Sequence, residues 1–140
     1  MLSIFICEDN QSQRERMEAI VRNYILIENY SMELTLSVGS PSELLDYLEV
    51  HPAKNALYFL DVDLQHEMNG ILLAFELRKL DAFGKIVFIT VHAELSYLTF
   101  KYRVEALDYI IKSSKNDIAN RRKDRTGISA RGIMLLLSWQ

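Results

Sequence analysis

The chain has 140 residues and a formal net charge of −3, with 49% hydrophobic and 25% charged residues. This length predicts one domain with a single core, and the composition is ordinary for a globular protein. No apolar run is long enough to span a bilayer, so we expect no membrane partner.

The charge is unevenly distributed along the chain. Residues 1–112 carry 17 acidic and 10 basic side chains, a net charge of −7, and residues 113–140 carry 2 acidic and 6 basic ones, a net charge of +4. The acidic body argues against nucleic acid as its direct partner. The basic tail could contact an anionic surface or simply be solvated.

The N-terminus and the single cysteine indicate a cytoplasmic protein. The opening MLSIFICEDN lacks the basic start and small-residue cleavage site of a signal peptide, and it instead predicts a first strand. Cys7 has no partner for an internal disulfide, as is usual in a reducing compartment. Because Cys7 lies in an apolar run, we interpret it as an inert core thiol.

Five short apolar stretches alternate with helical patterns. They predict strands at residues 2–7, 34–38, 56–60, 86–89 and 106–111. Apolar residues at 17, 20, 21 and 24 predict a first amphipathic helix. In SPSELLDYL, Ser40 is a candidate N-cap, Pro41 suits the first helical position and Glu43 completes a capping box. A third helix is expected after Gly70 and a fourth over residues 94–102.

This alternation predicts an α/β fold, a doubly wound five-stranded parallel sheet with helices on both faces. In such folds ligands bind outside the carboxyl ends of the strands. Polar residues follow four of these ends. They are Glu8 and Asp9 after the first strand, Asp61 and Asp63 after the third, Thr90 after the fourth and Lys112 after the fifth.

The chemistry of this set favours metal-assisted phosphoryl transfer. A polar turn after a buried strand would alone explain YFLDVDL, but crowded carboxylates repel and need a cation, and Mg²⁺ prefers oxygen ligands. Lys112 would supply a point charge for phosphate oxygens, and the Thr90 hydroxyl would hydrogen-bond one of them. The Asp61 carboxylate could then act as a nucleophile and form an acyl phosphate.

These segments resemble the receiver domains of two-component response regulators over residues 1 to about 112. FICEDN is similar to the acidic-pair strand, YFLDV to the phosphoacceptor strand, IVFIT to the switch-threonine strand and ALDYIIK to the lysine strand. The wording HAELSYLTFKYRVEALDYIIK is closer still to the LytTR class, including accessory-gene-regulator-like quorum-sensing regulators of Gram-positive bacteria. Those usually carry a C-terminal DNA-binding domain, and DNA contact would need such a domain, which this sequence lacks.

The resemblance implies the flavodoxin-like receiver fold and a role for each matched residue. Asp61 would accept a phosphoryl group from the phosphohistidine of a sensor histidine kinase. The Mg²⁺ cofactor would be held by the side chains of Asp9 and Asp61, by the backbone carbonyl of Asp63, and by Glu8 through water. Lys112 would pair with the phosphoryl group.

The remaining implied roles concern switching and dephosphorylation. Thr90 would move to bond the phosphoryl group, and Tyr109 would swing with it, unless it is simply a core tyrosine. Asp63 and His92 would tune autodephosphorylation. Three positions depart from the family pattern: Gly70 lies nine rather than eight residues after Asp61, without the usual proline between them, Ser113 replaces the proline after the lysine, and Val91 replaces a smaller residue.

The C-terminus departs further from the family. We expect the receiver domain to cover residues 1–118 and residues 119–140 to form an atypical tail, because arginines at 121, 122 and 125 fall where a fifth helix should be apolar. The apolar GIMLLLSW then has no clear partner. It is either a truncated or altered C-terminus, or residues 133–137 cover the bare sheet face in their own chain or in a neighbour's.

We therefore expect a phosphorylation-dependent switch, rather than a turnover enzyme, that serves transcription regulation in quorum sensing. A homodimer could form through the 94–103 helix with the 106–111 strand, or through the tail. Two alternatives stay open. One is a haloacid-dehalogenase-type phosphatase, suggested by Asp-Val-Asp at 61–63, and the other is a pseudo-receiver that binds partners without phosphorylation.

Overall fold

A computed structural model describes residues 1–28, 31–63, 68–90, 104–112, 130–138 and 140. In chain order the elements are β1 (Leu2–Cys7), α1 (Gln11–Glu28), β2 (Met32–Val38), α2 (Pro41–Val50), β3 (Ala56–Leu60), α3 (Gly70–Leu80), β4 (Lys85–Thr90), β5 (Asp108–Ile111) and α5 (Ala130–Ser138). The fourth expected helix, at residues 94–102, lies outside the described residues.

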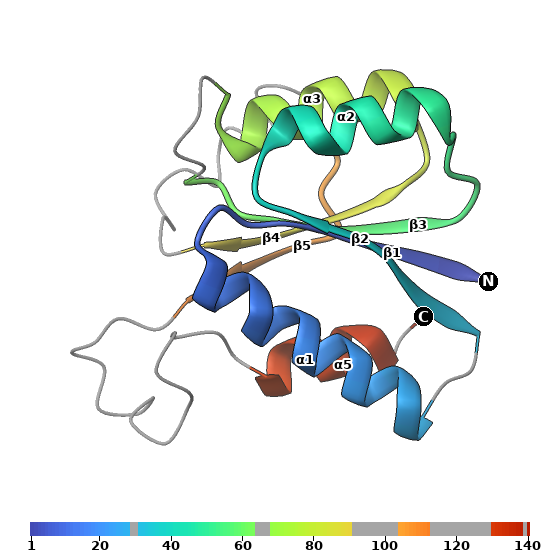
Figure 1. Cartoon of the computed structure of the whole chain (residues 1–140), viewed down its shortest axis with the longest axis vertical. Helices are drawn as coiled ribbons and strands as arrows, with labels where there is room; N and C mark the ends of the chain where they lie inside the picture. Colours follow the sequence, from blue (N-terminus) through green and yellow to red (C-terminus); the bar gives the residue numbers. More distant parts are fainter. Residues whose placement is uncertain (29–30, 64–67, 91–103, 113–129, 139) are drawn as a thin grey trace.

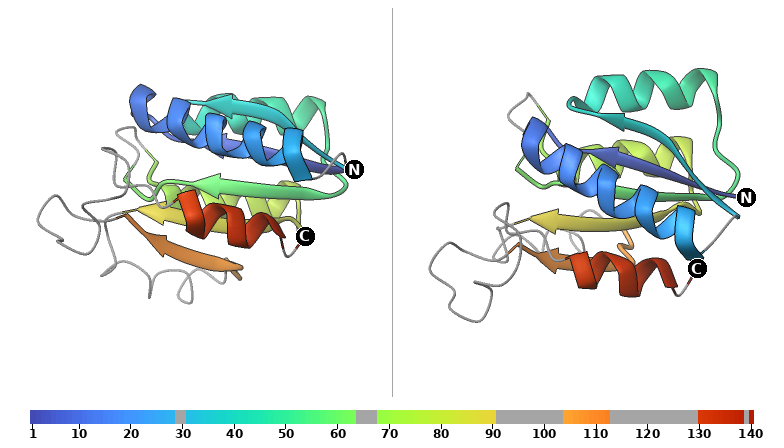
Figure 2. Two further views of the ribbon diagram at one scale, coloured as in Figure 1. Left: turned by 90° about the horizontal axis from the view of Figure 1, so that it is seen from below. Right: turned by 60° about the horizontal axis from the view of Figure 1, so that its bottom comes forward.

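The strands form one parallel sheet in the order β2-β1-β3-β4-β5. Helices α2 and α3 cover one face of the sheet, and α1 and α5 cover the other (Figure 1). Figure 2 shows the strands side by side, with α1 and α5 lying over them roughly along the strand direction. The predicted doubly wound α/β fold is therefore confirmed.

The strand limits follow the apolar stretches closely. β1 and β3 have the predicted bounds, β2 begins two residues earlier than expected and β4 extends by one residue at each end. The last strand was predicted too long, because β5 begins at Asp108 rather than at residue 106. Before it the backbone turns sharply, since Glu105 has φ 56°, a left-handed conformation that a strand cannot continue.

Side-chain caps fix the starts of two helices. Ser40 caps α2 as predicted, because its hydroxyl accepts a hydrogen bond from the Glu43 amide at 3.3 Å. Asn69 caps α3 in the same way through the Leu72 amide at 2.9 Å. The helix expected after Gly70 is present and begins one residue earlier, at Gly70 itself, and that start determines how closely α3 approaches the end of β3.

The central strands are buried on both faces, as their continuous apolar runs predict. One hydrophobic cluster, under α2 and α3, contains Phe5, Cys7, Tyr58 and Phe88, and the other, under α1 and α5, contains residues such as Ile4, Phe59 and Val87. Burial, together with nearby carboxylates, raises the pKa of the Cys7 thiol to about 12. Cys7 is thus the inert core thiol that the sequence indicated.

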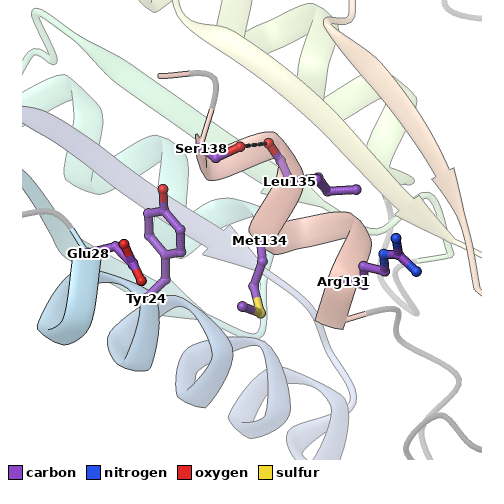
Figure 3. Close-up of a pocket in the computed structure, with 6 residues that line it drawn as sticks. All are labelled: Tyr24, Glu28, Arg131, Met134, Leu135 and Ser138. Atoms are coloured by element: carbon purple, nitrogen blue, oxygen red, sulfur yellow. Dashed lines mark hydrogen bonds between the residues drawn. The ribbon is translucent and has the colours of Figure 1, made fainter.

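Helix α5 closes the α1 side of the core. Ile133 and Leu137 are fully buried in the same cluster as Met17 and Ile20 of α1. Figure 3 shows α5 lying beside α1, with Met134 pointing into the shallow pocket between the two helices. The interpretation that residues 133–137 cover the bare sheet face is confirmed, since Ile133 and Leu137 pack on the sheet within their own chain. Among the described helices, none is long and apolar enough to cross a membrane.

Arg78 joins two loops at the amino ends of β4 and β5. Its guanidinium donates hydrogen bonds to the Val104 carbonyl at 2.7 Å, to the Glu105 carbonyl at 3.0 Å, and closely to the Gly84 carbonyl. Arginine suits this role because its planar fork presents five donors at fixed angles. The side chain therefore fixes the turn from which β5 starts.

Asp81 organises the same region from the other side. Its carboxylate accepts hydrogen bonds from the Tyr58 hydroxyl at 2.7 Å and from the Gly84 amide at 2.9 Å. Burial, with the adjacent Asp81 carboxylate, raises the pKa of Tyr58, so the hydroxyl stays a donor. Tyr58 is fully buried, and this bond satisfies the polar atom of the largest side chain in the core.

Replacing Arg78 with alanine should lower the free energy of unfolding by about 2–3 kcal/mol, because several partly buried carbonyls would lose their donor. Lys79→Ala is the matched control, since Lys79 is exposed and its contacts are at the surface, an ion pair with Glu76 at 3.1 Å and a cation–π contact 4.9 Å from the centroid of the Phe75 ring. That change should cost less than about 0.5 kcal/mol. Urea unfolding followed by circular dichroism measures both, and equal losses would contradict the bracing role of Arg78.

Candidate functional site

The carboxyl ends of four parallel strands bring together the residues singled out from the sequence. Glu8 follows β1, Asp61 follows β3, Thr90 ends β4 and Lys112 follows β5. The described polar or charged residues classed as buried are these four, with between 0% and 6% of their surface exposed. Backbone bonds align the ends, since the Asp61 amide donates to the Cys7 carbonyl at 3.1 Å and the Lys112 amide to the Thr90 carbonyl at 2.7 Å.

The Lys112 ammonium is the centre of this group. Its Nζ donates to Asp61 Oδ2 at 2.8 Å and lies 3.5 Å from Glu8 Oε2. It also donates, at close range, to Oε1 of Gln13. A buried ammonium needs such partners, because an unpaired charge in the interior is strongly destabilising.

The Asp61 carboxylate is held by both of its oxygens. Oδ2 accepts the bond from Lys112, and Oδ1 accepts one from the Asp63 amide at 3.0 Å. The carboxylate is therefore oriented by one charged donor and one backbone donor. The Asp63 side chain is exposed, and this hydrogen bond to Asp61 is made by its backbone amide.

Three carboxylates converge at this point. Glu8, Asp9 and Asp61 each offer an oxygen atom, and these atoms lie within 4.8 Å of one another. Asp9 is half-buried, so the cluster opens to solvent on its side. Hard oxygen donors at this spacing fit a small divalent cation such as Mg²⁺.

The protonation of the buried pair follows from its surroundings. Burial raises the pKa of Glu8 to about 9, and the hydrogen bond with Asp61 and the negative charge of Asp61 add to this rise. Burial also acts to raise the pKa of Asp61, but the hydrogen bond from Glu8 and the Lys112 charge outweigh it and lower the pKa. At neutral pH Asp61 is therefore the ionised partner, and without a metal ion Glu8 keeps its proton.

The start of α3 packs directly against the Asp61 backbone. The Gly70 amide donates to the Val62 carbonyl at 2.9 Å. A Cβ atom on Gly70 would lie 1.9 Å from the Asp61 carbonyl oxygen and 2.7 Å from its carbon. Only glycine allows this approach, which fixes the main chain that carries the Asp61 carboxylate.

Thr90 and Tyr109 have different surroundings. Thr90 is fully buried at the end of β4. Tyr109 is half-buried on β5, and its ring packs against Phe88 with the centroids 5.6 Å apart. Tyr109 thus packs against the core cluster under α2 and α3 and remains partly exposed. His92, Val91 and Ser113 lie outside the described residues.

Sequence reasoning missed Gln13 and Arg14, which lie on the first turns of α1. Gln13 contacts Lys112, and Nη1 of Arg14 donates to the Glu8 carbonyl at 2.8 Å. The sequence does place both residues a few positions after the acidic pair, at the start of a helix that leaves the same edge of the sheet. That position was the only sequence feature that could have indicated a role in the site. Polar residues there are common at any helix start, so the pattern alone did not distinguish them.

The site opens into a cavity of about 430 Å³. Its lining is polar and consists of Glu8, Asp9, Asn10, Gln11, Gln13, Asp61, Asp63 and Lys112. The cavity combines a buried carboxylate, an ammonium and a cluster of carboxylate oxygens. This arrangement is suited to receiving a phosphoryl group.

Comparisons with known proteins agree with this geometry. The family model described as the response regulator receiver domain matches residues 4–121. Accessory gene regulator protein A of Staphylococcus epidermidis is 47% identical over 121 residues, covering 86% of this chain and 50% of that protein. The protein of the same name from Staphylococcus aureus is 45% identical over 124 residues, with the same coverage. The chain thus spans about half the length of the curated relatives it matches.

A solved structure shows the same fold. The response regulatory domain of protein mrkE from Klebsiella pneumoniae superposes with a TM-score of 0.73 at 23% sequence identity. The superposition covers 98% of this chain and 93% of that domain.

Gly70→Ala should lower the free energy of unfolding by about 1–3 kcal/mol, because the added methyl group meets backbone that cannot move aside cheaply. Gly39→Ala is the matched control. There a Cβ atom would first meet Nη1 of Arg14 at 2.9 Å, and the end of a flexible side chain can shift. Urea unfolding of both variants tests the difference, and a loss no greater at Gly70 than at Gly39 would contradict the close approach of α3 to Asp61.

Proposed function

Since the chain belongs to the family of response regulator receiver domains, we propose that it is a phosphorylation switch with Asp61 as phosphoacceptor. A sensor histidine kinase is the expected donor. The observation that carries the proposal is the Asp61 carboxylate, kept ionised by Lys112 at 2.8 Å and facing an open polar cavity. Family members are signalling switches, and we propose no turnover reaction on an external substrate.

We propose Mg²⁺ as the cofactor, and the donor set supports this choice. Glu8, Asp9 and Asp61 would hold the ion, with the Asp63 carbonyl as a further oxygen ligand. Burial, the hydrogen bond with Asp61 and the negative charge of Asp61 raise the pKa of Glu8, and a cation bound beside these carboxylates would counter that rise by neutralising charge in the cluster. When bound, the ion would neutralise charge on the phosphoryl oxygens.

The transfer itself is an in-line displacement by Asp61. A carboxylate oxygen forms a bond to phosphorus as the bond from phosphorus to the kinase imidazole nitrogen breaks, and the electron pair stays on that nitrogen. The Lys112 ammonium stabilises the negative phosphoryl oxygens, and the Thr90 hydroxyl donates to one of them. Attack by water on phosphorus later breaks the bond to Asp61, which regenerates the carboxylate and releases inorganic phosphate.

The switch would act through β4 and β5. Movement of Thr90 toward the phosphoryl group leaves space that the Tyr109 ring can enter, since Tyr109 packs against Phe88 on the same strand as Thr90. Beside Tyr109, Leu107 and Ile111 are 51% and 45% exposed. These apolar side chains support our proposal that the β5 surface, with the 94–103 segment outside the described residues, forms an output or homodimer contact. Asp63 and His92 remain the proposed residues that tune dephosphorylation.

The wider role is also a proposal. By similarity to the accessory gene regulator proteins, we infer a cytoplasmic regulator of transcription in quorum sensing. DNA would be contacted by a part of the relatives that these 140 residues do not match. Residues 1–118 would carry the receiver site, with α5 completing the core beside α1. The family match does not favour the haloacid-dehalogenase alternative. The alternative of a module that binds partners without phosphorylation has to be tested by experiment.

Incubation with acetyl phosphate and Mg²⁺ should add one phosphoryl group per chain, measured by intact mass spectrometry. The adduct should be labile to hydroxylamine, as an acyl phosphate is, and absent from Asp61→Asn. Asp46→Asn, an exposed change on α2, is the control and should be modified like the wild type.

Other outcomes would contradict the proposal. Bound Mg²⁺ without any phosphoryl adduct would indicate a module that binds partners independently of phosphorylation. Steady hydrolysis of phosphate monoesters would indicate a phosphatase. An adduct that persists in Asp61→Asn would place the acceptor elsewhere.

A further inference from the structure

We propose that Gln13 is a positioning residue for phosphoryl transfer, whose side-chain amide oxygen holds the Lys112 ammonium over Asp61. The inference rests on the proposed phosphoacceptor function and adds to it a residue outside the acidic cluster. It starts from the direct hydrogen bond that Lys112 Nζ donates to Oε1 of Gln13, across a separation of 99 residues in the sequence.

Gln13 is one of two close hydrogen-bond partners of the Lys112 ammonium. An ammonium has three N–H donors and no acceptor, so the atom of Gln13 that faces it must be the amide oxygen. Within the described part of the chain, three oxygens face the ammonium, from Asp61 at 2.8 Å, from Glu8 at 3.5 Å and from Gln13. Because the Glu8 contact is long, Asp61 and Gln13 are the two close partners that define where the ammonium lies.

Gln13 is itself held by a rigid element. Its backbone amide donates to Asn10 Oδ1 at 2.9 Å, which fixes the first turn of α1. The next residue, Arg14, donates from its backbone amide to the Asn10 carbonyl at 2.9 Å and from its side chain to the Glu8 carbonyl at 2.8 Å. The half-buried Gln13 side chain therefore starts from a main chain tied to the end of β1.

The neutrality of the amide matters for the chemistry. When Asp61 is phosphorylated, its carboxylate is replaced by an acyl phosphate, and Lys112 must transfer a hydrogen bond from the carboxylate to a phosphoryl oxygen. The bond to Gln13 can stay in place during this change, so the ammonium pivots instead of being released. An uncharged acceptor does this without adding negative charge beside the incoming phosphoryl group.

A positioning role of Gln13 differs from a purely structural role because it depends on Lys112. If Gln13 acts through the ammonium, its replacement must have no effect once the ammonium is gone. If Gln13 only stabilises α1, its replacement must have the same effect with or without Lys112. A double-mutant cycle distinguishes these cases.

The test compares the wild type, Gln13→Met, Lys112→Met and the double variant in the initial rate of phosphorylation by acetyl phosphate with saturating Mg²⁺. Methionine retains the length and the apolar stem of both side chains. We expect Gln13→Met to slow phosphorylation about tenfold, with the double variant no slower than Lys112→Met. Ser12→Met, an exposed change on the same helical turn, should leave the rate unchanged.

A second measurement reads the position of Lys112 without phosphorylation. Nitrogen-15 NMR of the Lys112 ammonium should show slowly exchanging protons in the wild type and fast exchange in Gln13→Met, with urea unfolding used to show that the variant folds. Equal slowing by Gln13→Met in both backgrounds, an unchanged rate, or an unchanged ammonium signal would overturn the proposal. If the ammonium signal depends on Gln13 but the wild type takes up no phosphoryl group, the proposed function is refuted. Only the contact between Gln13 and Lys112 would then be supported.

Discussion

The organisation of this site depends on the ion pair between Lys112 and Asp61. The two side chains are 4% and 6% exposed, and their charged atoms are 2.8 Å apart. Removing both charges from water is costly, and a buried pair is tolerated only when further hydrogen bonds satisfy the remaining donors and acceptors. Glu8, Gln13 and the Asp63 amide supply those hydrogen bonds. The elements that carry these residues must therefore meet at the ion pair.

The pair also assigns different protonation states to two buried carboxyls. Glu8 and Asp61 share one site, but Lys112 lies 2.8 Å from Asp61 and 3.5 Å from Glu8. The hydrogen bond from Glu8 and the charge of Lys112 lower the pKa of Asp61, whereas burial, the hydrogen bond with Asp61 and the charge of Asp61 raise the pKa of Glu8. The same asymmetry supports the proposal that Asp61 is the nucleophile, with Glu8 and Asp9 as candidate cation ligands.

Much of this architecture could be predicted from the sequence. Continuous apolar runs located the strands to within about two residues, and the rule that parallel strands share one edge was enough to bring Glu8, Asp61, Thr90 and Lys112 together. Their catalytic and switching roles are still proposals. The contacts of single side chains on α1 and α3 were not predictable. Whether Gln13 reaches Lys112, and whether Arg78 reaches the loops before β4 and β5, depends on the angle at which each helix packs on the sheet.

The tail shows a second limit of sequence reasoning. The nine residues of α5 carry no signal for a partner within their own segment, and the packing of Ile133 and Leu137 depends on the face that α1 leaves uncovered. Such tertiary contacts override local patterns. The short β5 has a similar origin, since its start is set by the Arg78 hydrogen bonds and by the left-handed Glu105 rather than by apolar residues.

The most direct test of this account is a carbon-13 NMR titration of the Glu8 and Asp61 carboxyls in metal-free protein. Asp61 should titrate below its ordinary pKa of about 3.9, and Glu8 far above its ordinary value of about 4.3, near 9. Stability due to Asp61 is then present above pH 4 and lost as the pH falls through its lowered pKa. Stability due to Glu8 is greatest below pH 4 and lost as the pH rises toward 9. Lys112→Met should raise the pKa of Asp61. A wild-type Asp61 that titrates at or above its ordinary value, or an Asp61 whose pKa is unchanged in Lys112→Met, would contradict the claim that the buried lysine keeps the proposed phosphoacceptor ionised.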